Sequence, residues 1–154
     1  MTTDITSEQV KKLRAETGAP VMEVRRALME SNGDPVSAKE ILQERGLEKA
    51  AKRAERATAQ GLIEAYVHTD SRVGALVHLA CETDFVTRTD EFKALAHEIV
   101  MQVASMNPQS VDELLEQEYI RDSAKKVRDL VAEVAAKTGE NIQIKRIARF
   151  ELGD

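Results

Sequence analysis

The fold is decided at residues 61–81, which read GLIEAYVHTDSRVGALVHLAC. Ile63, Ala65 and Val67 stand at every second position, and a second alternating series follows residues 70–74. That second series consists of Ala75, Val77, Leu79 and Cys81. Because successive side chains of a strand point to opposite faces, a period of two favours a strand. The stretch therefore predicts a β-hairpin.

Downstream of the hairpin, apolar residues recur at helical spacing in two stretches. The first contains Phe92, Leu95, Ala96, Ile99 and Val103, and it ends by Asn107 and Pro108. The second contains Val127, Leu130, Val131, Val134 and Ala135, and it ends at Gly139. A last strand is predicted over residues 141–152. Residues 61–152 are thus expected to form a three-stranded antiparallel sheet packed on two main helices.

Upstream, residues 6–46 predict three short helices. Thr6 and Gln9 have the spacing of a capping box at the start of the first helix. Asp34 is a suitable N-cap for the third helix, because the proline that follows it suits the first helical position. Gly46 stands where a glycine commonly ends a helix. We therefore expect a three-helix domain at residues 1–46.

Residues 47–60, LEKAAKRAERATAQ, predict a linker helix, because they combine high helix propensity with a weak apolar stripe. In this interpretation all seven glycines lie at element boundaries, which are Gly18, Gly33, Gly46, Gly61, Gly74, Gly139 and Gly153. The expected class is α+β, with a three-helix domain, a linker helix and a strand–helix core module at residues 61–154.

Composition excludes several classes of function. The 154-residue chain has a net charge of −5, which argues against direct binding of nucleic acid. Two Tyr, three Phe and no Trp leave little surface for base stacking. No apolar run has the length of a membrane span, and residues 1–6 lack the features of a secretory signal. We expect a cytoplasmic protein that binds another protein and no membrane.

The sequence contains no recognisable catalytic constellation. His97 and Glu98 begin an HExxH pattern, but residue 101 is Met, so the second zinc ligand is missing. The glycine-rich loops that hold nucleotide phosphates are absent. The single Cys81 is expected to behave as a small buried hydrophobe rather than a redox or zinc residue. We therefore expect no enzyme, no cofactor and no metal.

Three segments, in order along the chain, resemble the elongation factor Ts family. Residues 10–28, VKKLRAETGAPVMEVRRAL, resemble its opening signature, and residues 81–88, CETDFVTR, contain its Thr-Asp-Phe-Val motif. Residues 138–146, TGENIQIKR, resemble its ending. Three such segments with matching spacing are hard to obtain by chance. The departures from the family pattern are Pro20, Arg25, Arg26 and Ala80.

The resemblance implies a translation factor of a short form with a single core module. Such a factor is a guanine nucleotide exchange factor without covalent chemistry. It binds the GTPase elongation factor Tu in its GDP-bound and nucleotide-free states, and it promotes GDP release by disturbing the magnesium and phosphate site. The resemblance also implies a ubiquitin-associated-like fold for residues 1–46 and a homodimer formed through residues 61–154.

The resemblance further assigns two sets of partner-binding residues. The set that acts near the magnesium site consists of Thr83, Asp84, Phe85 and Val86. The set in the N-terminal domain consists of Leu13, Arg14, Thr17, Gly18, Met22 and Arg26. Phe85 is flanked by polar residues, so we expect it to protrude from a loop as an interface anchor. The alternative is a core phenylalanine that caps the sheet.

Two other functions stay open on the sequence alone. The N-terminal helices could belong to a small adaptor that binds protein segments, although the Thr-Asp-Phe-Val and Gly-Glu-Asn-Ile segments count against it. A ribosome-associated RNA-binding protein would need a basic patch with interleaved aromatic residues, which the acidic composition does not supply.

Overall fold

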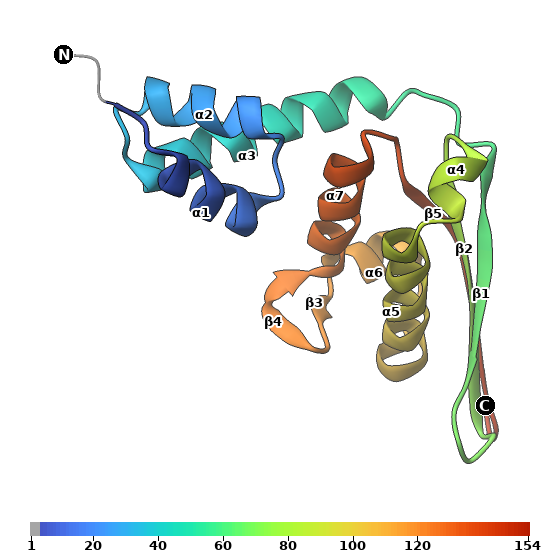
Figure 1. Ribbon diagram of the computed structural model, residues 1–154. Helices are drawn as coiled ribbons and strands as arrows, with labels where there is room; N and C mark the ends of the chain where they lie inside the picture. The colour runs from blue at the N-terminus through green and yellow to red at the C-terminus, as the bar shows by residue number, and fades with distance from the viewer. Residues whose placement is uncertain (1–3) are drawn as a thin grey trace. The chain divides into compact units, whose positions relative to one another are not determined.

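The computed structural model describes residues 4–154 (Figure 1). The chain divides into two compact units between Glu55 and Arg56, and each unit is described by itself. No helix within residues 4–154 is long and apolar enough to cross a membrane.

The first unit consists of α1 (Ser7–Thr17), α2 (Val21–Glu30) and α3 (Pro35–Arg53). The predicted capping box is present, because Gln9 N–H donates to Thr6 Oγ1 and Thr6 N–H donates to Gln9 Oε1. Asp34 caps α3 as predicted by accepting from two backbone N–H groups. The core residues of the unit are Leu13, Val24, Ala27, Leu28, Ala38 and Leu42.

The predicted end of the third helix at Gly46 is wrong. Helix α3 continues through Gly46 to Arg53, and β1 begins at Gln60, so no separate linker helix spans residues 47–60. The residues after Gly46 have high helix propensity, and one glycine in a helix costs only about 1 kcal/mol. A helix with good propensity on both sides therefore tolerates the glycine.

The second unit contains the predicted three-stranded antiparallel sheet. Its strands are β1 (Gln60–Val67), β2 (Val73–Cys81) and β5 (Gln143–Glu151), in the order β1-β2-β5. Gly61 and Gly74 lie inside strands rather than at boundaries. Gly61 has a φ of +150°, and a Cβ there would collide with the carbonyl oxygen of Leu79. Glycine at residue 61 thus permits close approach of β1 to β2.

Helices cover one side of this sheet (Figure 1). The predicted helices are α5 (Asp90–Met106), which packs against all three strands, and α7 (Val127–Thr138), which packs against α5. Four elements were not predicted, namely α4 (Asp84–Thr87), α6 (Val111–Glu116), β3 (Glu118–Tyr119) and β4 (Asp122–Lys126). The strands β3 and β4 form a separate hairpin whose residues are mostly polar and show no clear alternation.

The two faces of the sheet differ in exposure. The face toward the helices carries Val77 and Leu79, which are fully buried, with Leu62 and Tyr66 packed against them. The opposite face is open in the described unit. We call it the outer face, and it carries the apolar residues Ile63, Ala65, Val67, Leu76, Ala148 and Phe150 together with His78 and Arg146. Ile63, Ala65 and Val67 thus share one face as predicted, and that face is exposed.

Candidate partner-binding site

The Thr-Asp-Phe-Val segment forms a tight turn between the sheet and helix α5. Strand β2 ends at Cys81, Thr83 is still extended, and the segment then enters the short helix α4 (Asp84–Thr87). The expected loop is therefore one turn of helix. Thr89 begins α5, because its Oγ1 accepts a hydrogen bond from the N–H of Phe92 at 3.3 Å.

Adjacent residues of α4 point in opposite directions relative to the core. Phe85 is 76% exposed, whereas Val86 is 8% exposed and belongs to the core of the second unit. Asp84 is exposed and forms an ion pair with Arg88 at 3.2 Å, which at the surface contributes little to stability. Val86 therefore docks the turn onto the core, and Phe85 protrudes from it as expected.

A carboxylate from the end of α7 holds the start of this turn. Glu140 Oε1 accepts hydrogen bonds from the backbone N–H of Glu82 at 3.0 Å and of Thr83 at 2.9 Å. Glu140 Oε2 accepts a third bond from Thr83 Oγ1 at 2.6 Å. Thr83 thus uses its hydroxyl on Glu140 and makes no side-chain cap to its own helix.

A second contact runs in the opposite direction between the same two segments. The backbone N–H of Asn141 donates to Glu82 Oε1 at 2.6 Å. Glu82 also lies 3.6 Å from the guanidinium of Arg56, whose carbonyl oxygen accepts from Asn141 Nδ2 at 2.9 Å. Residues 82–83 and 140–141 are therefore joined by hydrogen bonds in both directions.

Sequence reasoning placed Glu82, Glu140 and Asn141 in motifs but gave them no role in the site. Within its motif Glu140 stands directly after Gly139, which ends α7 in the left-handed conformation with φ +72°. The sequence could not reveal that Glu140 accepts from Thr83, because 57 residues separate the two.

Cys81 is fully buried, as predicted for a small hydrophobe. Its Sγ lies 3.2 Å from both the carbonyl oxygen of Thr83 and the hydroxyl of Thr87. Burial is the main cause that raises the pKa of the Cys81 thiol. Since the thiolate is the reactive form, this environment disfavours nucleophilic chemistry.

The six residues assigned to the N-terminal set differ in burial and in local role. Arg14, Met22 and Arg26 are exposed, and Met22 and Arg26 lie one turn apart on α2. Leu13 is 2% exposed and belongs to the core of its unit. The remaining two shape the end of α1. Thr17 Oγ1 donates to the carbonyl oxygen of Leu13 at 2.8 Å, and Gly18 ends the helix with φ +68°.

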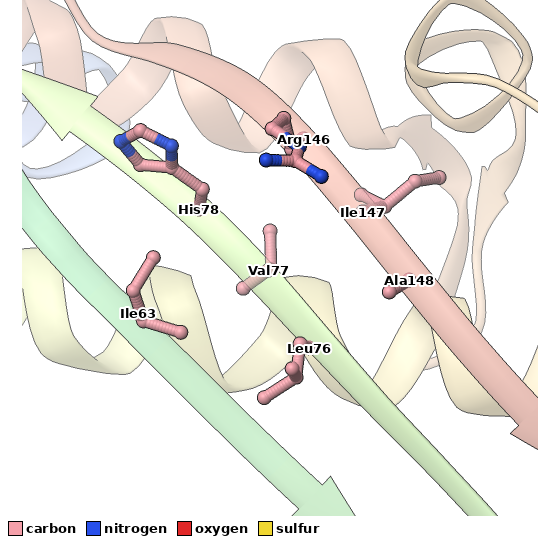
Figure 2. Close-up of a pocket in the computed structure, with 7 residues that line it drawn as sticks. All are labelled: Ile63, Leu76, Val77, His78, Arg146, Ile147 and Ala148. Carbon is pink, nitrogen blue, oxygen red and sulfur yellow. The ribbon is translucent and has the colours of Figure 1, made fainter.

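A shallow pocket lies on the sheet of the second unit. Figure 2 shows its lining on three neighbouring strands, with Ile63 on β1, His78 on β2 and Arg146 on β5. The side chains that surround it on the outer face are mostly apolar. Within residues 4–154, no group of three or more His, Cys, Asp or Glu side chains is placed to hold a metal ion.

Comparisons with known proteins agree on one family. The family model described as Elongation factor TS matches residues 82–154. Elongation factor Ts of Thermoanaerobacter sp. (strain X514) is 42% identical over 195 aligned positions, which cover 97% of this chain and 96% of the relative. Elongation factor Ts of Thermotoga neapolitana is 40% identical over 194 positions, which cover 98% of each chain.

A third relative differs in length. Elongation factor Ts of Clostridium acetobutylicum is 46% identical over 146 positions, which cover 95% of this chain and 47% of the relative. The first two alignments contain more positions than this chain has residues. Those relatives therefore carry residues that have no counterpart here.

Proposed function

This chain belongs to the elongation factor Ts family of translation elongation factors, and we propose that it is a guanine nucleotide exchange factor for elongation factor Tu. It binds the GDP-bound GTPase in the cytoplasm, passes through a nucleotide-free complex and is released by new nucleotide. It performs no covalent chemistry and contacts no nucleic acid directly.

The observation that carries this proposal is the exposure of Phe85 on a turn that is fixed on the core. Phe85 is 76% exposed, while its neighbour Val86 is buried. Large apolar side chains in the centre of an interface, ringed by polar groups, supply much of the binding energy of protein complexes. Asp84 and Arg88 give Phe85 such a polar surround. Phe85 inserts into the GTPase near its magnesium site and thereby disturbs the contacts that hold GDP.

One phenylalanine is not sufficient for strong exchange. Full burial of a Phe side chain contributes roughly 1.5 to 3 kcal/mol, which is about one to two powers of ten in an equilibrium constant. The first unit adds further contacts through the exposed Arg14, Met22 and Arg26. We propose that this unit is the ubiquitin-associated-like domain, that Leu13 supports its surface from the core, and that Thr17 and Gly18 shape the end of α1.

Binding of the exchange factor and binding of GDP are coupled reciprocally. The factor by which this protein weakens the affinity of the GTPase for GDP equals the factor by which GDP weakens its own binding. A complex that contains both GDP and the exchange factor must therefore form transiently.

The test is the release of a fluorescent GDP analogue from purified elongation factor Tu. With excess unlabelled GDP present, addition of this protein in amounts well below the GTPase should accelerate release. The control is the same GTPase without the protein. An unchanged release rate at saturating concentrations of this protein would contradict the proposal.

We further propose that two copies associate through the second unit. The outer face presents Ile63, Val67 and Phe150 at 62%, 64% and 77% exposure. A contiguous apolar patch of this kind commonly marks an interface. A two-fold symmetric dimer would cover the same face on both copies, and it would supply the second module that long relatives carry in one chain.

Analytical ultracentrifugation tests this dimer. Ile63→Glu places a charge on the outer face of each copy, so a symmetric interface receives it twice and should dissociate. Leu47→Glu is a matched control, because Leu47 is 71% exposed but lies in the first unit. A wild-type monomer at micromolar to near-millimolar concentration with full exchange activity would show that one module suffices.

A further inference from the structure

We propose that Glu140 is a positioning residue that holds the α4 turn in the orientation from which Phe85 protrudes, an inference that rests on the proposed exchange function. Glu140 does not have to touch the GTPase for this role. It acts through the three hydrogen bonds that its carboxylate accepts from Glu82 and Thr83.

The start of α4 needs support from outside its own sequence. A helix of four residues is too short to be stable alone, because nucleation fixes several residues for each hydrogen bond gained. The local cap is also missing, because the Thr83 side chain accepts no hydrogen bond from α4, while its hydroxyl donates to Glu140. The direction in which α4 leaves the sheet is therefore set by a residue from a distant segment.

A carboxylate suits this position better than a neutral acceptor. Two consecutive backbone N–H groups converge on Oε1, and a hydroxyl reaches Oε2. A carboxylate offers acceptor sites on both oxygens, and hydrogen bonds to a charged acceptor are stronger than neutral ones. The carboxylate of Glu140 thus accepts hydrogen bonds from all three of these donors at the start of the turn.

The support lies at the end of a helix that packs on the core. Gly139 ends α7 and turns the chain, so Glu140 projects from this end. The bond from Asn141 N–H back to Glu82 Oε1 ties the two segments from the other direction. The position of Phe85 is therefore fixed by contacts with the end of α7 on one side and by the packing of Val86 on the core on the other.

These two supports make separable contributions. Because Val86 belongs to the core, removal of the Glu140 carboxylate should leave Val86 docked and the fold intact, while the start of α4 should lose its fixed direction. The experiment is a double-mutant cycle that combines Glu140→Ala with Phe85→Ala, read as stimulated release of a fluorescent GDP analogue. Glu140→Ala alone should lower the release rate several-fold, and it should have no further effect once Phe85 is alanine.

A merely structural residue would give a different pattern. Its loss would lower the rate by the same factor with or without Phe85, and that additive result would overturn the proposal. The matched control is Glu133→Ala, which removes the same charge from α7 at an exposed ion pair with Lys125 and should leave release unchanged. The conservative Glu140→Gln keeps an amide oxygen for both N–H groups and should recover most of the lost rate.

Amide hydrogen exchange measured by NMR gives a readout that does not depend on the GTPase. In Glu140→Ala the amides of Glu82 and Thr83 should exchange faster, while amides in the middle of α5 keep their protection. Unchanged protection of these two amides would overturn the positioning role. Failure of the wild-type protein to accelerate GDP release would instead overturn the exchange function, and the two failures are therefore distinguishable.

Discussion

Phe85 and Phe92 lie on either side of Thr89, yet one side chain is 76% exposed and the other is fully buried. Phe92 begins the apolar stripe of α5, so its neighbours at helical spacing carry it into the core. Phe85 stands among polar residues on a one-turn helix whose inward position is taken by Val86. The comparison shows that the surrounding pattern, and not the residue type, decides whether a phenylalanine stabilises the fold or remains available for a partner.

The largest expected effect is that of Phe92→Ala. Truncation of a fully buried Phe leaves a cavity and should cost about 3–5 kcal/mol of stability. For a unit of this size the melting temperature should fall by more than about 10 °C. Thermal unfolding followed by circular dichroism measures this. A shift of only a few degrees would mean that the two phenylalanines do not differ as their burial indicates.

Val86→Ala sharpens the comparison within α4 itself. Val86 is 8% exposed, and loss of its two methyl groups should cost about 2 kcal/mol. Because Val86 docks the turn that carries Phe85, GDP release should also slow. Denaturant unfolding and release of the fluorescent analogue measure the two effects. A loss of exchange without any loss of stability would indicate that Val86 contacts the partner directly.

Thr89→Ala acts at the junction of the two regions. The Thr89 hydroxyl accepts from the N–H of Phe92 and donates to the carbonyl oxygen of Val86 at 2.8 Å. Loss of an N-cap of this kind should cost about 1 kcal/mol. Thr89→Ser keeps the hydroxyl and is the control that should retain most of this stability. Equal losses in both variants would point to the methyl group instead of the cap.

Local patterns predicted much of the fold. The hairpin, α5 and α7 follow from apolar periods of two and of about four residues, and the caps at Thr6 and Asp34 follow from their spacing. The β3–β4 hairpin was missed, because its mostly polar strands carry no alternation. Gly46 misled the prediction, because a glycine can end a helix but does not force it to end.

The candidate site was predicted only in part, because part of it depends on contacts between residues that are distant in the sequence. The segment at residues 83–86 could be recognised because it is a contiguous sequence motif, and the polar residues on both sides of Phe85 indicated that its side chain is exposed. The opposite orientation of Val86 and the hydrogen bonds from Thr83 to Glu140 depend on tertiary contacts. A single sequence has no period or spacing that reports contacts between such distant residues.

The smallest expected effect on stability is that of Phe85→Ala, and it is paired with a large effect on function. Phe85 is already 76% exposed, so its truncation removes little buried surface, and the melting temperature should stay near that of the wild type. Stimulated GDP release should nevertheless fall at least several-fold, because the apolar anchor is missing from the complex. Thermal unfolding and release of the fluorescent GDP analogue measure the two effects in one variant.

Phe150→Ala is the matched control for this prediction, since Phe150 has 77% exposure in the same unit but lies on the outer face. Both variants are assayed at protein concentrations high enough to keep any dimer associated. Phe150→Ala should then stimulate GDP release from the GTPase more strongly than Phe85→Ala does. Equal rates in the two variants would mean that general loss of exposed apolar surface, and not the place of Phe85, causes the defect. A melting temperature lowered by more than about 10 °C in Phe85→Ala would instead mean that Phe85 belongs to the core.

Asp84→Ala tests whether the polar neighbour of Phe85 also contributes to exchange. Asp84 is exposed, and its ion pair with Arg88 at the surface contributes little to stability. The variant should therefore slow stimulated GDP release without unfolding the protein.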